Sequence, residues 1–178
     1  TKVAEGDDII ATLVEYLKND KNIIISCDYD FLQLKSDGVD ILNLFGDELN
    51  FKTFCKSDQI TNSKEFLLFK ILFGDISDSI PHVLFKVGKK KCVDLVKNKE
   101  KLVQILNNDQ EARNRFILNS NLIDFRKIPL EVKNEIINEY NKALMEFKGK
   151  SRDASISRNT NIHTQNYKND KKETIILF

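Results

Sequence analysis

The residues best suited to chemistry are seven carboxylates in three short stretches of the sequence. They are Glu5, Asp7 and Asp8, then Asp28 and Asp30, and finally Asp75 and Asp78. Carboxylates without a neighbouring histidine are typical of sites for hard divalent cations, Mg²⁺ or Mn²⁺, which prefer oxygen ligands. Two such ions together hydrolyse phosphodiesters, because one generates hydroxide and the other neutralises the leaving oxygen. The pattern predicts such a site if the stretches converge.

Each stretch also has a structural interpretation. Asp28 and Asp30 follow the β-branched run 22–27, which favours a buried parallel strand. Ligands bind at the carboxyl ends of such strands, but a surface Asx turn would give the same pattern. Asp7 and Asp8 open a predicted helix, whose dipole favours one or two acids there. A third acid fits that interpretation less well, because the three repel one another.

The elements predicted around these acids begin with an amphipathic helix over 7–18 and the strand over 22–27. A short helical turn over 31–34 and an alternating strand over 39–44 follow, whereas 44–62 is ambiguous. A capping-box start at 62–65 opens a buried helix that ends at Gly74. Its Phe66, Phe69 and Phe73 are expected in the core rather than as a base-stacking platform.

Beyond Pro81 the pattern changes to short helices joined by loops. We expect a helix, a tight turn at Gly88 and a second helix within 82–98, then helices over 99–107 and 109–118. After an extended link, the longest helix covers 131–148 and ends at Gly149, and the polar stretch 150–174 is expected to be disordered. The predicted fold class is α/β, a parallel sheet in 1–80 followed by a helical domain in 81–148 and a tail in 149–178.

The composition of the 178 residues excludes few function classes, because 41% are hydrophobic and the net charge is +1. The charges are unevenly placed: residues 1–30 hold seven acids and three lysines, whereas 86–101 hold seven lysines and two acids. Such poles suit a metal site beside a phosphate-binding surface. The three cysteines have no zinc-like spacing, and no secretory or membrane-spanning segment is visible, so a reduced intracellular compartment is expected. Cys27 is expected to be a buried apolar residue.

Three segments together resemble a known family. The segments EGDDIIATL, SCDYDFLQL and FGDISDSIP resemble the flap endonuclease and 5′ nuclease superfamily, which has a PIN-like fold. Its bacterial and phage branch commonly reads EADD, DxDxxQL and GDxSDNIP in the same order. Residues 116–130 are also similar to the carboxy-terminal part of phage ribonuclease H enzymes, so the resemblance covers roughly residues 4–140.

The resemblance implies roles for the acids. Glu5 and Asp7 match acids of the first metal site, and Asp8 matches an extra acid of the bacterial and phage branch. Asp28 and Asp30 match the pair that holds a second Mg²⁺ or Mn²⁺, and Asp75 and Asp78 complete that site. Further aspartates and an arch of basic residues lie upstream in the family, and neither precedes Thr1. We therefore expect an incomplete active site, unless a separate polypeptide supplies the rest.

The resemblance also implies a helix-hairpin-helix that grips the DNA backbone. Its usual GxxGxG pattern is reduced here to Gly88, beside Lys86 and the run Lys89, Lys90 and Lys91. Helix amides and lysines bind phosphate, and the family often adds a monovalent cation such as K⁺ on turn carbonyls. The alternative is a solvated helix face.

The function that follows is metal-dependent 5′→3′ exonuclease and flap endonuclease action in DNA replication or repair, including RNA primer removal. The expected partners are branched or flapped duplex DNA and an RNA–DNA hybrid. A sliding clamp is a further candidate through residues 174–178, although a plain hydrophobic terminus fits better because the tail lacks the usual upstream glutamine. An intracellular location is expected, in cytoplasm or nucleus, with a phage or viral origin allowed.

Two alternatives remain open. The first is a phosphatase in which Asp28, the first acid of DxD, is the nucleophile, although such enzymes usually have Gly or Thr soon after the second acid, where Phe31 stands here. The second is a DNA-structure-binding module that does not cleave.

Overall fold

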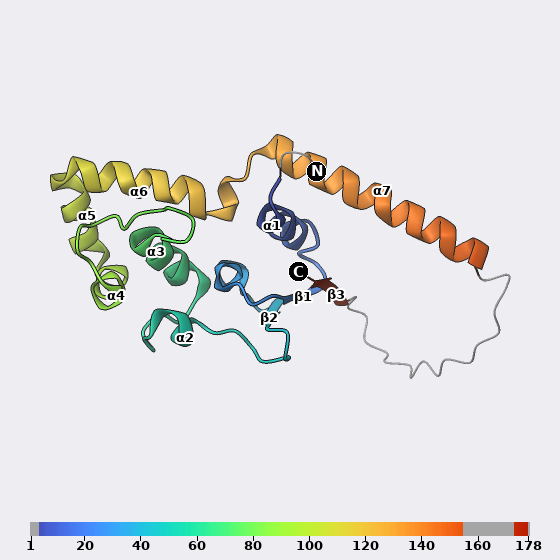
Figure 1. Cartoon of the computed structure of the whole chain (residues 1–178), viewed down its shortest axis with the longest axis horizontal. Helices are drawn as coiled ribbons and strands as arrows, with labels where there is room; N and C mark the ends of the chain where they lie inside the picture. Colours follow the sequence, from blue (N-terminus) through green and yellow to red (C-terminus); the bar gives the residue numbers. More distant parts are fainter. Residues whose placement is uncertain (1–3, 155–172, 178) are drawn as a thin grey trace.

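The computed structural model describes residues 4–154 and 173–177, in which a small parallel sheet lies among helices (Figure 1). This confirms the predicted α/β fold class. In chain order the elements are α1 (Gly6–Tyr16), β1 (Lys21–Ile25), the 3-10 helix η1 (Tyr29–Leu34), β2 (Val39–Leu42), α2 (Phe51–Cys55), α3 (Ser63–Phe73), α4 (Lys89–Lys97), α5 (Lys99–Asn108), α6 (Gln110–Ile123), the 3-10 helix η2 (Phe125–Lys127), α7 (Leu130–Ala154) and β3 (Glu173–Leu177).

The sheet has the order β2-β1-β3, and both neighbours run parallel to β1. Ile24 of the central strand pairs with Ile41 on one side and Ile176 on the other, and its side chain is fully buried. The carboxyl ends of parallel strands meet at one edge. Asp28 and Asp30 come directly after β1, so they lie just beyond this edge of the sheet.

Helix α1 shares a core with the sheet and packs against α7. Ile10 and Val14 of α1 belong to the same buried cluster as Ile24. On the other side, Tyr16 meets Tyr140 edge-to-face with ring centroids 6.2 Å apart. The first turn of α1, which carries three acids, is thereby fixed relative to β1.

Helix α3 packs against η1, α4 and α6, and it lies below α6 in the left part of Figure 1. Its start follows the predicted cap, because Asn62 Oδ1 accepts the Glu65 N–H at 3.0 Å. Phe66 and Phe69 are fully buried, as expected for core residues. At its end Gly74 has a φ of +70°, and a Cβ there would lie 2.5 Å from the Ile80 carbonyl oxygen. Only glycine fits this close approach, which directs Asp75 back toward the sheet.

Three expectations are wrong. No helix precedes Gly88, because residues 81–88 form an irregular segment in which Val83 and Val87 are buried, and so short a helix gains little from its own hydrogen bonds. Helix α7 continues through Gly149 to Ala154, since one glycine costs a helix only about 1 kcal/mol. Cys27 is exposed, because it lies just past the end of β1.

The C-terminal tail is only partly described. Glu173–Leu177 form β3, where a structureless end was expected, and residues 155–172 and 178 lie outside the described residues. Within the part of the chain that is described, no helix has the length and apolar character needed to cross a membrane.

Candidate metal and nucleic-acid site

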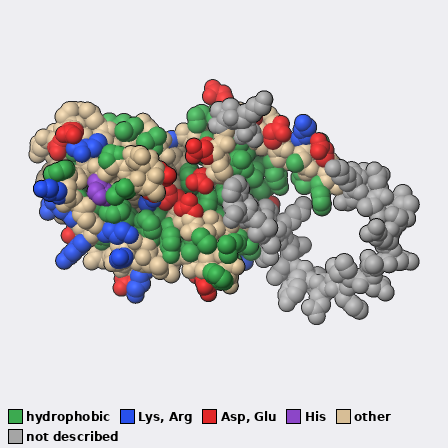
Figure 2. All heavy atoms as spheres, in the orientation of Figure 1, with side chains coloured by type: hydrophobic (Ala, Val, Ile, Leu, Met, Phe, Trp, Pro, Cys, Tyr) green, Lys and Arg blue, Asp and Glu red, His purple; other side chains and the backbone are tan. Residues whose placement is uncertain are grey.

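A cavity of about 200 Å³, here called the acidic cavity, opens between α1, η1, the loop after α3 and the link from α6 to α7. Its carboxylates are Glu5, Asp7, Asp8, Asp30, Asp78 and Asp124. Acidic side chains gather near the middle of the face in Figure 2, while basic ones lie mostly to its left. Parts of the sequence far from one another thus contribute to one negatively charged hollow.

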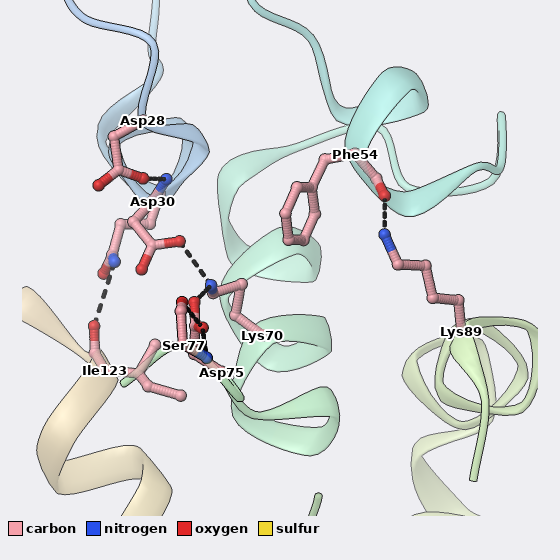
Figure 3. A network of polar contacts seen from close by, with 9 residues as sticks. Asp28, Asp30, Phe54, Lys70, Asp75, Ser77, Lys89 and Ile123 are labelled. Carbon is pink, nitrogen blue, oxygen red and sulfur yellow. Dashed lines mark hydrogen bonds and ion pairs between the residues drawn. The ribbon is translucent and has the colours of Figure 1, made fainter. Parts of the chain in front are cut away.

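The turn after β1 sets the direction of the two strand-end acids. The Asp28 N–H donates to Ser26 Oγ at 3.0 Å, and the Asp30 N–H donates to Asp28 Oδ1 at 2.8 Å. The Asx turn considered from the sequence is therefore present, with Asp28 as its first residue (Figure 3). It starts η1 and directs the Asp30 side chain toward α3.

Lys70 of α3 joins Asp30 to the loop that follows α3. Its Nζ lies 2.6 Å from Asp30 Oδ1 and 2.7 Å from Asp75 Oδ2, and its side chain is 2% exposed (Figure 3). Burial alone would lower the pKa of Lys70, but the two carboxylates outweigh it and raise that pKa. Sequence reasoning did not single out Lys70. The available signal was a lysine inside the apolar run of 66–73, five residues before Asp75.

The two partners of Lys70 titrate differently. Burial raises the pKa of Asp30 more than Lys70 lowers it, and the charges of Asp28 and Asp75 add to the rise. Burial acts in the same direction on Asp75, but Lys70 and Ser77 outweigh it and lower the pKa of Asp75 to about 2. Ser77 donates both its N–H, at 3.0 Å, and its hydroxyl to Asp75 Oδ1. Asp75 is therefore the firmly ionised member of the pair.

The acids of α1 face the strand-end acids. Burial raises the pKa of Asp7 to about 6, and the charges of Asp28, Asp30, Glu5 and Asp8 contribute further. Asp8 also has a structural role, since its Oδ2 accepts the Glu5 N–H at 3.2 Å and caps the helix. All three acidic stretches of the sequence thus meet, with Asp75 joined to Asp30 through Lys70.

Asp124 lines the acidic cavity and Gln33 fastens the backbone beside it, and neither residue was singled out from the sequence. Gln33 Nε2 donates to the Ile123 carbonyl at 3.1 Å, while its Oε1 accepts the Phe125 N–H at 3.2 Å. This amide fastens η1 to the end of α6. Asp124 lies between Ile123 and Phe125 in the chain, and its side chain is 5% exposed. Its Oδ2 forms an ion pair with Arg126 Nη2 at 2.6 Å.

The basic residues expected to grip DNA have distinct placements. Lys90 and Lys91 are exposed in the first turn of α4, and Gly88 precedes that turn with a φ of −90° that any residue adopts. Lys86 has a φ of +53°, and its Nζ lies over the exposed Phe85 ring. Lys89 turns inward, where its Nζ donates to the Phe54 carbonyl at 2.5 Å (Figure 3).

The chemistry of the acidic cavity fits a hard divalent cation. Its donors are carboxylate oxygens, and the pKa of Asp7 is raised first by burial and then by the negative charges around it, which a cation would relieve. Among the described residues, however, no three His, Cys, Asp or Glu side chains are grouped closely enough to ligate one ion directly. Mg²⁺ keeps several of its waters and needs only one or two carboxylates, which reconciles these two observations.

Comparison with known proteins gives relatives in both sequence and structure, although no protein-family profile matches the chain. The 5′-3′ exonuclease of Buchnera aphidicola subsp. Schizaphis graminum is 32% identical over 111 residues, which cover 61% of this chain and 38% of that protein. Its counterpart from the Acyrthosiphon pisum subspecies is 28% identical over 132 residues, or 73% of this chain and 44% of that protein. The chain thus spans less than half the length of these curated relatives.

Solved structures of bacteriophage T5 proteins have a similar fold. A mutant of the T5 5′-exonuclease superposes with a TM-score of 0.60 at 18% identity, covering 78% of this chain and 65% of that one. The T5 flap endonuclease in a pseudo-enzyme–product complex with DNA and metal ions gives 0.60 at 17% identity, covering 78% and 59%. Another T5 structure was determined with zinc bound.

These comparisons say what the chain is similar to: in sequence, bacterial 5′-3′ exonucleases, over less than half of their length. In fold, it is similar to T5 5′-exonuclease and flap endonuclease structures.

Proposed function

We propose that this chain is the metal-binding and DNA-binding part of a structure-specific 5′ nuclease that hydrolyses phosphodiesters with two divalent ions. The observation that carries the proposal is the convergence of acids from α1, the β1–η1 turn and the loop after α3 around the acidic cavity and Lys70. The similarity to 5′-3′ exonucleases supports it.

The proposed ligands fall into two sets. Glu5, Asp7 and Asp8 would serve one ion, and Asp28, Asp30, Asp75 and Asp78 the other. When bound, the ions would supply a water of lowered pKa and neutralise charge on the leaving oxygen. Lys70 holds Asp30 and Asp75 together with a buried ammonium.

Lys86, Gly88, Lys89, Lys90 and Lys91 would hold the duplex downstream, since lysine charge and free helix amides bind phosphate. The T5 complex with DNA and metal ions supports this choice of partner. A helix-hairpin-helix with a bound K⁺ stays a prediction, and the irregular segment 81–88 gives the first helix of that motif no support.

The nuclease proposal is tested with a labelled 5′-flap substrate and Mg²⁺ or Mn²⁺, using the whole chain. Asp28→Asn and Asp75→Asn should each reduce cleavage by at least about a hundredfold, because each removes a charge that holds an ion. Asp58→Asn is the matched control, since Asp58 makes only an exposed ion pair with Lys52. Cleavage that both site variants leave unchanged would contradict the metal assignment.

A second candidate is a module that binds branched DNA without cutting it. The chain spans 38% and 44% of the two relatives' lengths, and this short match favours binding without cleavage for the isolated chain. Tight binding to a flap without cleavage in Mg²⁺ would select it. The phosphatase alternative has less support, since the fold similarity is to 5′ nucleases and Asp28 Oδ1 accepts the Asp30 N–H.

The remaining predictions follow from the nuclease proposal. They include action in DNA replication or repair and removal of RNA primers from a hybrid. They also include an intracellular location, in cytoplasm, nucleus or an infected cell. Each of these predictions depends on which nucleic acid the protein cleaves. A clamp contact through 174–178 would have to release residues that pair with β1.

A further inference from the structure

A second cavity, of about 370 Å³, lies between α2 and α4 and is here called the lysine pocket. Its lining includes Lys56 and Ser57 after α2, Gln59, and Lys89, Lys90 and Asp94 from α4. Three ammonium groups therefore face one hollow that contains a single carboxylate. Lysines that repel one another at close range indicate a site for an anion.

The lysines of this pocket are not neutralised within the fold. Among the residues that the structure describes, Lys56 and Lys90 have no ion-pair partner, and both side chains are exposed. Lys89 uses the Phe54 carbonyl as acceptor, a neutral group. Burial, together with Lys56 and Lys70, lowers the pKa of Lys89, so an anion in the pocket would relieve an unfavourable concentration of positive charge.

The backbone at Lys56 is also unusual. Lys56 follows the last residue of α2 with a φ of +53° and a ψ of 40°, a left-handed conformation that glycine and asparagine adopt more readily. A lysine there costs of the order of 1 kcal/mol relative to glycine. Such outliers are concentrated at binding sites.

The pocket lies one side chain away from the acidic cavity. The Phe54 ring has Lys70 Nζ 5.2 Å from its centroid and Lys89 Nζ 4.4 Å from the same centroid (Figure 3). Lys70 in turn contacts Asp30 and Asp75. The lysine pocket and the acids that Lys70 joins are therefore neighbours across one aromatic side chain.

We propose that the lysine pocket binds one backbone phosphate of the DNA whose strand reaches the acidic cavity, with Lys56 and Lys90 on that phosphate from opposite walls. The inference rests on the proposed nuclease function, and it adds α2 and the segment 56–59 to the DNA-contacting surface. Ser57 and Gln59 supply neutral donors beside the charges, as phosphodiester oxygens require.

The test measures DNA binding by fluorescence anisotropy on a labelled duplex with hairpin-closed ends, in a chelator, over a range of NaCl concentrations. Lys56→Asn removes the charge and keeps a residue that accepts the left-handed backbone, and Lys90→Gln removes the second charge with little cost to the helix. Each should weaken binding about fivefold and reduce the salt slope by clearly less than about 0.9, whereas the double variant, which loses the phosphate contact altogether, should reduce it by about 0.9. Lys56→Arg should keep near-native affinity.

Because the two lysines share one phosphate, the double variant should lose clearly less than the product of the single losses, about tenfold rather than about 25-fold. Lys142→Gln, an exposed lysine on α7, is the matched control and should change neither affinity nor slope. Thermal unfolding of each variant excludes a folding defect as the cause.

The outcomes separate the two proposals. If Lys56→Asn changes affinity and salt slope no more than Lys142→Gln does, or if the losses of affinity in the double variant are fully additive, the proposal of a shared phosphate is wrong. Cleavage of the flap by the same protein would then still support the nuclease function. Wild-type protein that neither binds the duplex nor cleaves the flap would overturn both.

Discussion

At the scale of single residues, the site depends on one buried ammonium between two carboxylates. Lys70 is 1% exposed, and a buried charge is tolerated only when it is paired and hydrogen-bonded. Asp30 and Asp75 supply that pairing at 2.6 and 2.7 Å. The strength of this arrangement can be measured as free energy of unfolding.

Lys70→Met should destabilise the chain by about 3 kcal/mol at pH 7, because it leaves the partly buried carboxylates of Asp30 and Asp75 without a counter-charge. The folded pKa of Asp75, about 2, lies below its unfolded value of 3.8, so this stabilisation is complete above pH 4 and is lost as pH falls toward 2. Urea unfolding of both proteins at several pH values measures the difference. Lys97→Met, which breaks an exposed pair with Glu65, should cost under about 1 kcal/mol, and an equal loss in both variants would contradict this account.

Asp7 should show the opposite pH dependence. Its folded pKa, about 6, lies above the unfolded value of 3.8, so its ionisation destabilises the folded chain as pH rises from about 4 to about 6. In the absence of divalent ions, Asp7→Asn should therefore be more stable than wild type at pH 7, by about 1 kcal/mol once solvent screening is considered, and equal to it at pH 4. Thermal unfolding in a chelator tests this. Asp58→Asn should have no such pH-dependent effect, and a destabilised Asp7→Asn at pH 7 would refute the crowding of charge.

At the scale of elements, the end of α3 decides where the third acidic stretch lies. Gly74 directs the chain back, the Asp75 N–H donates to the Ile80 carbonyl at 2.9 Å, and Asn119 of α6 donates to the Pro81 carbonyl at 2.8 Å. The loop is therefore fixed at both ends, and Asp75 meets Lys70 without further adjustment.

Gly74→Ala should cost about 3 kcal/mol or more, since it combines a positive φ with a Cβ 2.5 Å from two backbone oxygens. Gly88→Ala is the matched control, because its φ is −90° and nothing lies within 4 Å of its Cβ, so its cost should stay below about 1 kcal/mol. Denaturant unfolding of the two variants measures both. Similar losses would mean that the close approach after α3 is not rigid.

The elements that the sequence predicted are those with a local cause. The cap at Asn62 and the glycine at 74 define α3, and the β-branched run defines β1. Residues 82–87 looked helical by spacing, but tertiary burial of Val83 and Val87 keeps them irregular. Lys70 escaped notice because periodicity treats a lysine as surface, whereas its burial follows from partners at positions 30 and 75. The pairing of β3 with β1 is also a long-range contact that no local pattern encodes.

At the scale of the whole molecule, the acidic cavity and the lysine pocket carry opposite charges, and in Figure 2 acidic side chains gather near the middle while basic ones lie mostly to the left. Uncompensated carboxylates repel the same phosphates that the lysines attract, so the two sites act on DNA binding in opposite directions. Cations bound in the acidic cavity would offset its negative charge, and both sites would then favour DNA binding.

Divalent ions should therefore strengthen binding of a hairpin-closed duplex, whereas NaCl of equal ionic strength should weaken it. The expected gain is about tenfold in Mg²⁺, and anisotropy measures it. Combining Asp7→Asn with Asp30→Asn should abolish the gain, while Asp58→Asn should retain it. A Mg²⁺ effect identical to that of NaCl would show that no ion occupies the acidic cavity.

The ammonium of Lys70 has one more consequence, for the order of events during biosynthesis. Zinc fingers stay unfolded until their ion arrives, because nothing else can hold their ligands together. Here a side chain of the chain itself already neutralises part of the acidic cluster, so, under the proposed function, the polypeptide would reach its tertiary structure before it binds ions. Starvation for divalent metal should then leave a folded, dormant pool that is ready for activation, rather than material bound for degradation.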